Sequence, residues 1–277
     1  MTLNHHLIGP SEIESIEKAL TAALAGTMVG VITNDSLITK ESQSTVFSQT
    51  ELKKASSYIN EKRRTEYLIG RYAIKMLLGR RLPQGTPLQL ITVDNNSDGA
   101  PFVRLDTSDT NHPILSSYFA TLLTPPIVSI THKAQIIIAV IAPEVTVQGI
   151  GVDLEYRTPQ KTTERARDRM VELIGGQKES SLVESVLSDV RRYQTGITDS
   201  VIDTDPFLAL FSIKEAVYKV LRGKANTLKK IDLLSFSQSK NPEDPFHSFR
   251  SQLRYQEQTV EAITLETEFF LVSLAWF

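Results

Sequence analysis

The chain has 277 residues, of which 41% are hydrophobic and 22% are charged, and its formal net charge is −2. These proportions are typical of a globular protein with one large or two ordinary domains. The small net charge excludes the strong basic excess of a general nucleic-acid binder. The absence of cysteine excludes disulfides, thiolate zinc sites and cysteine nucleophiles, and it is compatible with a reducing cytoplasm.

No segment has the pattern of a targeting signal or a membrane span. The most signal-like stretch, residues 19–32, follows three glutamates and is interrupted by two glycines, whereas a secretory signal needs a basic start and a continuous apolar core. The longest apolar run elsewhere, residues 134–143, is too short to cross a bilayer. We therefore expect a cytoplasmic protein without a membrane segment.

The first half of the chain alternates between helical and strand patterns. The expected helices are residues 11–24 and 48–79, the second broken near Asn60. The expected strands are residues 28–33, 88–93, 101–103, 127–130 and 135–141. Residues 104–126, rich in Ser, Thr, Asp and Pro, predict a loop, and residues 131–133 predict the turn between the last two strands.

The second half opens with an acidic strand near residue 151 and closes with alternating strands. Its expected helices are residues 162–173, 180–193 and 205–222, and its later strands are residues 253–255, 260–265 and 269–276. Pro143 and the Gln148-Gly149 turn predict a boundary between residues 1–147 and 148–277. The chain is therefore expected to be of the mixed α+β class, with no strict sequence repeat, although each half holds one long helix and several strands.

Two carboxylates lie two residues apart in Gly151-Val152-Asp153-Leu154-Glu155. In a strand this spacing puts Asp153 and Glu155 on one face. A buried carboxylate is costly unless it is paired or bound to a metal, and magnesium prefers oxygen ligands. The alternative is a strand end that emerges into solvent, with both acids hydrated.

A second motif, residues 211–219, places Glu215 and Lys219 four residues apart, on one face of a helix. Together with the acidic strand it offers three carboxylates and one ammonium, the outline of a phosphoryl-transfer site with magnesium. Two alternatives stay open. Ser212-x-x-Glu215 also fits a capping box at a helix start, and Lys219 could form a surface ion pair with Glu215.

Cationic side chains in the first half could contact phosphate. Arg64, Arg71 and Lys75 share a helical stripe, and arginine forks suit phosphate oxygens. A histidine at the predicted turn, His132, is accompanied by Thr131 and Lys133. The alternatives are a solvated charged helix face and an ordinary turn histidine.

Four motifs in this order resemble the 4′-phosphopantetheinyl transferases of the larger, monomeric surfactin-synthesis type, most closely their enterobactin-synthesis branch. The motifs are residues 63–71, 129–132, 149–155 and 211–219. The resemblance covers about residues 60–235 and is most specific in the last two motifs. It implies a fold of two similar α/β halves in pseudo-twofold arrangement, with coenzyme A in the cleft between them.

The resemblance implies transfer of the phosphopantetheine arm of coenzyme A to a serine of an acyl or peptidyl carrier protein, with release of adenosine 3′,5′-bisphosphate. It implies that Asp153, Glu155 and Glu215 hold Mg²⁺ and that Glu215, directly or through a metal-bound water, takes the serine proton. Lys219 would neutralise charge on the pyrophosphate with help from Lys214. The implied catalytic residues are Asp153, Glu215 and Lys219.

The resemblance also assigns coenzyme A contacts to the first half. Arg71 and His132 would grip the 3′-phosphate, and Thr131 would donate a further hydrogen bond. From its place on the helical stripe with Arg71, we also expect Arg64 to contact coenzyme A.

The chain departs from the family at Ala100, which follows Gly99 and precedes Pro101 where the family commonly has a polar residue. We expect Lys133 to restore part of the lost phosphate attraction. Residues 176–200 have no counterpart in the family pattern and could shape carrier choice.

Two other functions remain open, a catalytically idle module that binds coenzyme A and docks a carrier, and a magnesium-dependent phosphohydrolase. Retention of all three acids and Lys219 argues against the idle module.

Overall fold

The structure is a computed structural model. It describes residues 9–24, 26–33, 40–105, 125–133, 135–157, 164–175, 177–194, 204–222, 224–225, 227–239 and 246–277. Most of the loop predicted for residues 104–126, and the last part of the 176–200 region, lie outside the described residues. By its internal contacts the chain divides into two compact units, Met1–Gln148 and Gly149–Phe277.

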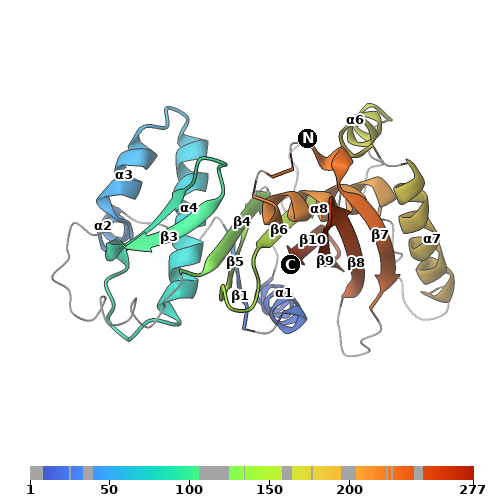
Figure 1. The fold of residues 1–277 in the computed structure, drawn as a ribbon. Helices are drawn as coiled ribbons and strands as arrows, with labels where there is room; N and C mark the ends of the chain where they lie inside the picture. The colour runs from blue at the N-terminus through green and yellow to red at the C-terminus, as the bar shows by residue number, and fades with distance from the viewer. Residues whose placement is uncertain are drawn as a thin grey trace, which may run out of the picture. The chain divides into compact units, whose positions relative to one another are not determined.

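Unit 1 is built on a five-stranded antiparallel sheet in the order β1-β5-β4-β3-β2 (Figure 1). Its strands are β1 (Met28–Thr33), β2 (Ile91–Asn95), β3 (Pro101–Leu105), β4 (Ile127–Lys133) and β5 (Ile136–Ala142). Its helices are α1 (Pro10–Ala23), α2 (Lys40–Val46), α3 (Gln49–Ser56), α4 (Glu61–Gly79) and the 3₁₀ turn η1 (Leu88–Leu90). The long helix α4 packs on the sheet, where Ile74 and Leu77 join the core formed with Val128 and Ile137.

The predicted break near Asn60 is confirmed and has a local cause. Asn60 caps α4, since its side-chain oxygen accepts a hydrogen bond from the backbone N of Arg63 at 3.1 Å. The preceding helix α3 starts with a complete capping box between Ser48 and Glu51. The predicted helix of residues 48–79 is therefore two helices, one that starts after the cap at Ser48 and one that starts after the cap at Asn60.

Two local predictions for unit 1 are wrong. Residues 131–133 form the end of β4 and not a turn, because His132 and Lys133 still pair with Ile137 and Ile136 of β5. The strand expected from Leu88 begins only at Ile91, because the residues before it form η1.

Unit 2 is built on a second five-stranded antiparallel sheet, in the order β6-β10-β9-β8-β7. Its strands are β6 (Ile150–Tyr156), β7 (Asp232–Gln238), β8 (His247–Tyr255), β9 (Gln258–Glu266) and β10 (Phe270–Trp276). Its helices are α6 (Glu164–Ile174), α7 (Gln177–Gln194), α8 (Pro206–Val220) and the 3₁₀ turn η3 (Leu228–Lys230). The apolar helix α8 lies across β6, β10 and β9, where Leu210 and Ile213 are completely buried.

The expected α+β class is confirmed, and the two units have the same topology. In each unit the first strand is followed by helices, and a four-stranded meander then returns its last strand to the side of the first. This internal repeat is invisible in the sequence. The polar strand β7 was also missed, because only two of its seven residues are buried.

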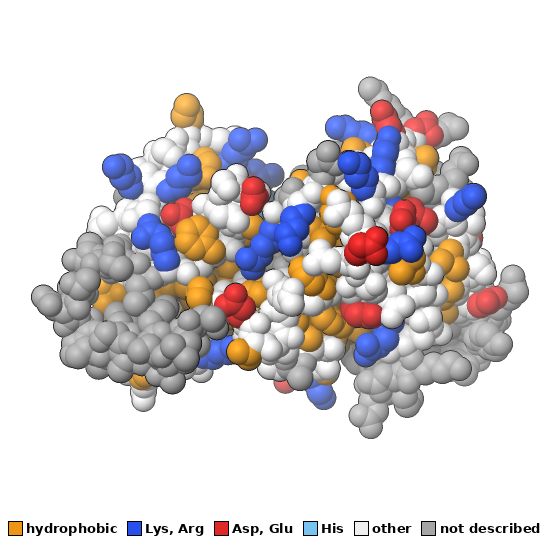
Figure 2. Space-filling model, in the orientation of Figure 1, with side chains coloured by type: hydrophobic (Ala, Val, Ile, Leu, Met, Phe, Trp, Pro, Cys, Tyr) orange, Lys and Arg blue, Asp and Glu red, His pale blue; other side chains and the backbone are white. Residues whose placement is uncertain are grey.

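None of the helices within the described ranges is long and apolar enough to cross a membrane. On the visible face of each unit, Lys and Arg side chains occur together with Asp and Glu (Figure 2).

Candidate active site

The acidic strand and the second motif meet because Gly151 lets α8 approach β6 closely. A Cβ atom at Gly151 would lie 2.0 Å from the carbonyl oxygen of Ala216 and 2.9 Å from the backbone N of Val220. No other residue fits there without displacing the helix. The two motifs are therefore held together by a contact between backbones.

This approach places Lys219 of α8 against Asp153 of β6. The Nζ atom of Lys219 donates to Oδ1 of Asp153 and to the carbonyl oxygen of Val152, both at 2.8 Å. Asp153 is only 5% exposed, and its second oxygen, Oδ2, is buried without a hydrogen-bond partner among the described residues. A buried carboxylate oxygen in this state is costly unless a cation or a donor approaches it.

Two of the alternatives for these motifs are wrong. Asp153 does not emerge into solvent, although Glu155, on the same face of β6, is half-buried. Glu215 does not close a capping box, because α8 begins at Pro206 and is capped by Asp205, whose side chain accepts from the backbone N of Phe207 at 2.8 Å.

Ser212, the proposed start of that box, lies inside the helix. It is completely buried, and its hydroxyl donates to Ser273 of β10 at 3.0 Å. Glu215 is half-buried on the next turn of α8 and is not needed to start the helix.

The residues predicted to hold magnesium suit the ion in chemistry, but they are not preassembled. In the part of the chain that the structure describes, no three His, Cys, Asp or Glu side chains form a ready-made metal site. Asp153, Glu155 and Glu215 offer the oxygen ligands that magnesium prefers. Among the described atoms of these three carboxylates, Oδ2 of Asp153 is buried without a hydrogen-bond partner, which suits the approach of a cation.

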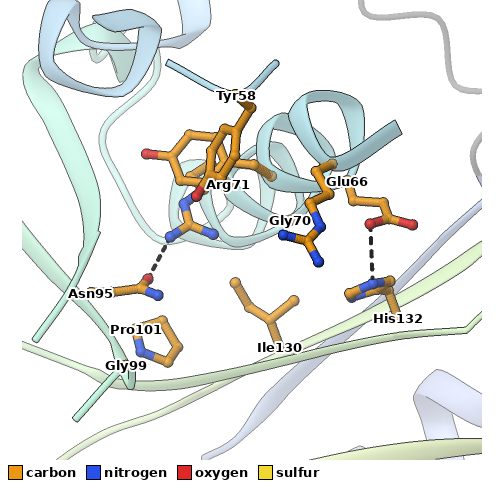
Figure 3. Close-up of a pocket in the computed structure, with 11 residues that line it drawn as sticks. Tyr58, Glu66, Gly70, Arg71, Asn95, Gly99, Pro101, Ile130 and His132 are labelled. Carbon is orange, nitrogen blue, oxygen red and sulfur yellow. Dashed lines mark hydrogen bonds and ion pairs between the residues drawn. The ribbon is translucent and has the colours of Figure 1, made fainter. Parts of the chain in front are cut away.

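Unit 1 has a pocket of about 310 Å³ beside α4 (Figure 3). It is lined by Tyr58, Arg63, Glu66, Tyr67, Gly70, Arg71, Asn95, Gly99, Pro101, Ile130 and His132. The pocket thus brings together Arg71, His132 and the residues that flank Ala100, which come from three separate segments of the sequence.

Arg71 is the most firmly held cation of this pocket. It is 8% exposed, its Nε donates to the carbonyl oxygen of Val93 at 3.3 Å, and its Nη2 donates to Oδ1 of Asn95. The guanidinium carbon of Arg71 lies 3.9 Å from the centroid of the Tyr67 ring. Burial raises the pKa of the Tyr67 phenol, while the charge of Arg71 opposes that rise, so the ring is neutral at physiological pH.

His132 lies across the pocket from Arg71, with its Nε2 3.5 Å from Oε2 of Glu66. Thr131 and Lys133 do not join it, contrary to the prediction. That prediction depended on a turn, whereas successive residues of a strand face opposite sides. Ile130 and His132 both line the pocket because residues two apart in a strand share a face, and Thr131 is buried on the other face of β4.

Of two adjacent arginines, the pocket lining includes Arg63 and not Arg64. Arg64 is exposed and is not among the lining residues, whereas Arg63 lines the pocket. Arg63, Tyr67 and Arg71 follow one another at intervals of four, and this spacing on one helix face could have identified Arg63. Asn95 and Tyr58 were missed because no spacing connects them to α4.

Two of the candidate lysines, Lys214 and Lys75, are buried in ion pairs. Lys214 was expected to assist the pyrophosphate, but it is completely buried and pairs with Glu179 at 2.7 Å. Lys75, which shared a helical stripe with Arg64 and Arg71 as a candidate phosphate contact or as part of a solvated face, is also completely buried and pairs with Glu51 at 2.6 Å. Neither ammonium can contact a phosphate in this conformation.

One family model matches part of the chain, within unit 2. Residues 149–267 match the 4′-phosphopantetheinyl transferase superfamily, a region that contains Asp153, Glu155, Glu215 and Lys219. A search of curated proteins found no match to the chain.

Two solved structures are similar to part of the chain. A holo-[acyl-carrier-protein] synthase from Neisseria meningitidis is 12% identical over 43% of this chain and 96% of its own, with a TM-score of 0.35. A holo-ACP synthase from Plasmodium yoelii is 16% identical over 43% of this chain and 92% of its own, with a TM-score of 0.34. These similarities are too weak to support a functional conclusion by themselves.

Proposed function

We propose that the protein transfers the 4′-phosphopantetheine arm of coenzyme A to a serine of an acyl or peptidyl carrier protein and releases adenosine 3′,5′-bisphosphate. The observation that carries the proposal is the pairing of Lys219 with Asp153, inside the region that matches the superfamily. An ammonium and a buried carboxylate that still has an oxygen available for a cation are suited to a metal-bound pyrophosphate.

In this proposal four side chains of unit 2 divide the tasks of the reaction, and Glu215 has two of them. Asp153, Glu155 and Glu215 would hold Mg²⁺, which when bound would neutralise the charge of the pyrophosphate. Glu215 would accept the proton of the carrier serine, whose oxygen forms a new bond to the β-phosphorus. The bond from that phosphorus to the bridging oxygen breaks, and Lys219 would stabilise the negative charge of the leaving adenosine 3′,5′-bisphosphate.

The pocket of unit 1 would bind the nucleotide end of coenzyme A. Arg71 offers a guanidinium whose position is fixed by Val93, Asn95 and Tyr67, and a fixed fork suits a phosphate group. Arg63 and His132 add cationic or hydrogen-bonding groups around the same space. Because one chain carries both the pocket and the catalytic motifs, we further propose that it acts as a monomer. We also propose that it acts in the cytoplasm, as the sequence led us to expect.

The test is the mass of a carrier protein. The protein is incubated with coenzyme A, Mg²⁺ and an apo acyl carrier or apo peptidyl carrier, and the intact carrier is weighed. A gain of one phosphopantetheine group supports transfer. Release of nucleotide without a mass change indicates a phosphohydrolase, and binding of coenzyme A without either result indicates an idle module.

A further inference from the structure

Each unit buries one lysine of its long helix against a glutamate of the preceding helix. In unit 1, Lys75 of α4 lies 2.6 Å from Glu51 of α3, and both side chains are completely buried. In unit 2, Lys214 of α8 lies 2.7 Å from Glu179 of α7, and the lysine is again completely buried. Each lysine also donates to the backbone carbonyl of the last residue of the next helix upstream, Val46 of α2 at 2.8 Å or Ile174 of α6 at 3.1 Å.

The second oxygen of each glutamate holds the outermost strand of its sheet. Oε1 of Glu51 accepts from the backbone N of Val93 on β2 at 2.9 Å, and Oε1 of Glu179 accepts from the backbone N of Leu233 on β7 at 2.5 Å. Both amides lie two residues after the isoleucine that ends the preceding 3₁₀ turn. The two networks therefore connect the same four elements in the same way.

The first strand of each unit repeats a further contact. A Cβ atom at Gly30 of β1 would lie 3.0 Å from the side chain of Leu77, and one at Gly151 of β6 would meet the backbone of Ala216. Leu77 and Ala216 each follow the buried lysine by two residues. This agreement shows that Lys75 and Lys214 are equivalent positions of an internal repeat.

The two networks differ in what they hold. In unit 1 the carbonyl of Val93 accepts from Nε of Arg71, so a chain of hydrogen bonds runs from Glu51 through Val93 to the guanidinium. In unit 2 the lysine of the pair adjoins Glu215 and lies five residues before Lys219 on α8. The Glu51–Lys75 pair thus fixes the Arg71 side chain of the pocket. The Glu179–Lys214 pair fixes α8, the helix that carries Glu215 and Lys219.

We propose that Glu51–Lys75 and Glu179–Lys214 are equivalent positioning pairs with separate tasks, an inference that rests on the proposed function. The first pair sets Arg71 for the 3′-phosphate of coenzyme A. The second sets α8, with Glu215 and Lys219, for the transfer step. Lys214 therefore acts through the position of the helix and not through contact with the pyrophosphate.

Glu51→Ala and Glu179→Ala form the test, because each removes an ion pair to the buried lysine and a hydrogen bond to the outermost strand at equivalent positions. Glu51→Ala also removes the acceptor of the Ser48 backbone N in the capping box of α3, so the two variants are compared by their preference between two substrates and not by total activity. Carrier modification is measured with coenzyme A and with 3′-dephospho-coenzyme A. For Glu51→Ala we expect the preference for coenzyme A, as the ratio of kcat/KM values, to fall about tenfold through KM, the effect of losing one well-placed charged hydrogen bond. For Glu179→Ala we expect kcat to fall with both substrates and the preference to stay unchanged.

Calorimetry measures the same preference for a 3′-phosphate without any transfer, by comparing the binding of adenosine 3′,5′-bisphosphate with that of adenosine 5′-monophosphate. This binding test of the inference remains valid even if no carrier is modified. If an alanine variant does not fold by circular dichroism, Glu51→Gln and Glu179→Gln replace the pair. Equal loss of 3′-phosphate preference in both variants, or its retention in Glu51→Ala, would overturn the inference. A wild-type protein that binds the bisphosphate but modifies no carrier would instead overturn the proposed function.

Discussion

Lys219 donates to one oxygen of Asp153 at 2.8 Å, while the other oxygen of Asp153 is buried and has no hydrogen-bond partner within the described parts of the chain. Only one of the two carboxylate oxygens of Asp153 is therefore satisfied by a hydrogen bond. A carboxylate in this position favours a second cation, and the magnesium proposed for the site would supply it.

Replacement of Lys219 by methionine tests this relationship. Lys219→Met leaves the Asp153 carboxylate without its ammonium, so we expect the free energy of unfolding to fall by about 1–3 kcal/mol and transfer to be lost. In the variant the negative charge of Asp153 is buried without the ammonium that compensates it. Added Mg²⁺ should therefore raise the melting temperature of the variant more than that of the wild type. Equal responses to Mg²⁺ would argue against a cation at Asp153.

Glu215→Gln separates catalysis from helix capping. Because α8 begins at Pro206 and Asp205 caps it, we expect the variant to stay within about 0.5 kcal/mol of the wild type in urea unfolding. Carrier modification should be lost, because the amide neither accepts the serine proton nor binds a metal as a carboxylate does. Normal transfer by this variant would remove Glu215 from the mechanism.

The pocket of unit 1 predicts different effects for two adjacent arginines. Arg63→Ala should raise the KM for coenzyme A with little change in kcat, because Arg63 lines the pocket. Arg64→Ala, at an exposed position outside the lining residues, is the matched control and should leave both constants unchanged. Arg71→Ala should have the largest effect on KM. A larger effect of Arg64 than of Arg63 would show that the pocket is not the nucleotide site.

Two glycines predict opposite changes in stability. Gly151→Ala places a methyl group 2.0 Å from the carbonyl oxygen of Ala216, so we expect a loss of at least about 1–3 kcal/mol. Gly70→Ala meets Ile130 at an ordinary 3.5 Å inside a helix, and it should stabilise the protein by about 0.5–1 kcal/mol. Thermal unfolding of both variants checks the close approach of α8 to β6.

The sequence predicted the parts of the site that depend on local spacing. The acidic strand, the helix of Glu215 and Lys219 and the break at Asn60 all follow from periodicity and capping chemistry within one element. The phosphate role of Arg71 came from the resemblance, and it stays a prediction.

What the sequence could not predict depends on contacts between distant residues. The burial of Lys75 and Lys214 needs glutamates 24 and 35 residues away, and nothing in a helical pattern reveals such partners. The strand that continues through His132 is fixed by its neighbour β5 and not by its own residues. The internal repeat is hidden for the same reason, since it lies in pairings and not in similar sequences.

The most direct test is the intact mass of an apo carrier after incubation with coenzyme A and Mg²⁺, with wild-type protein and with Asp153→Ala side by side. We expect the wild type to add one phosphopantetheine group and the variant to add none at any Mg²⁺ concentration. An unmodified carrier with the wild type, or equal modification by the variant, would contradict a transfer reaction centred on Asp153.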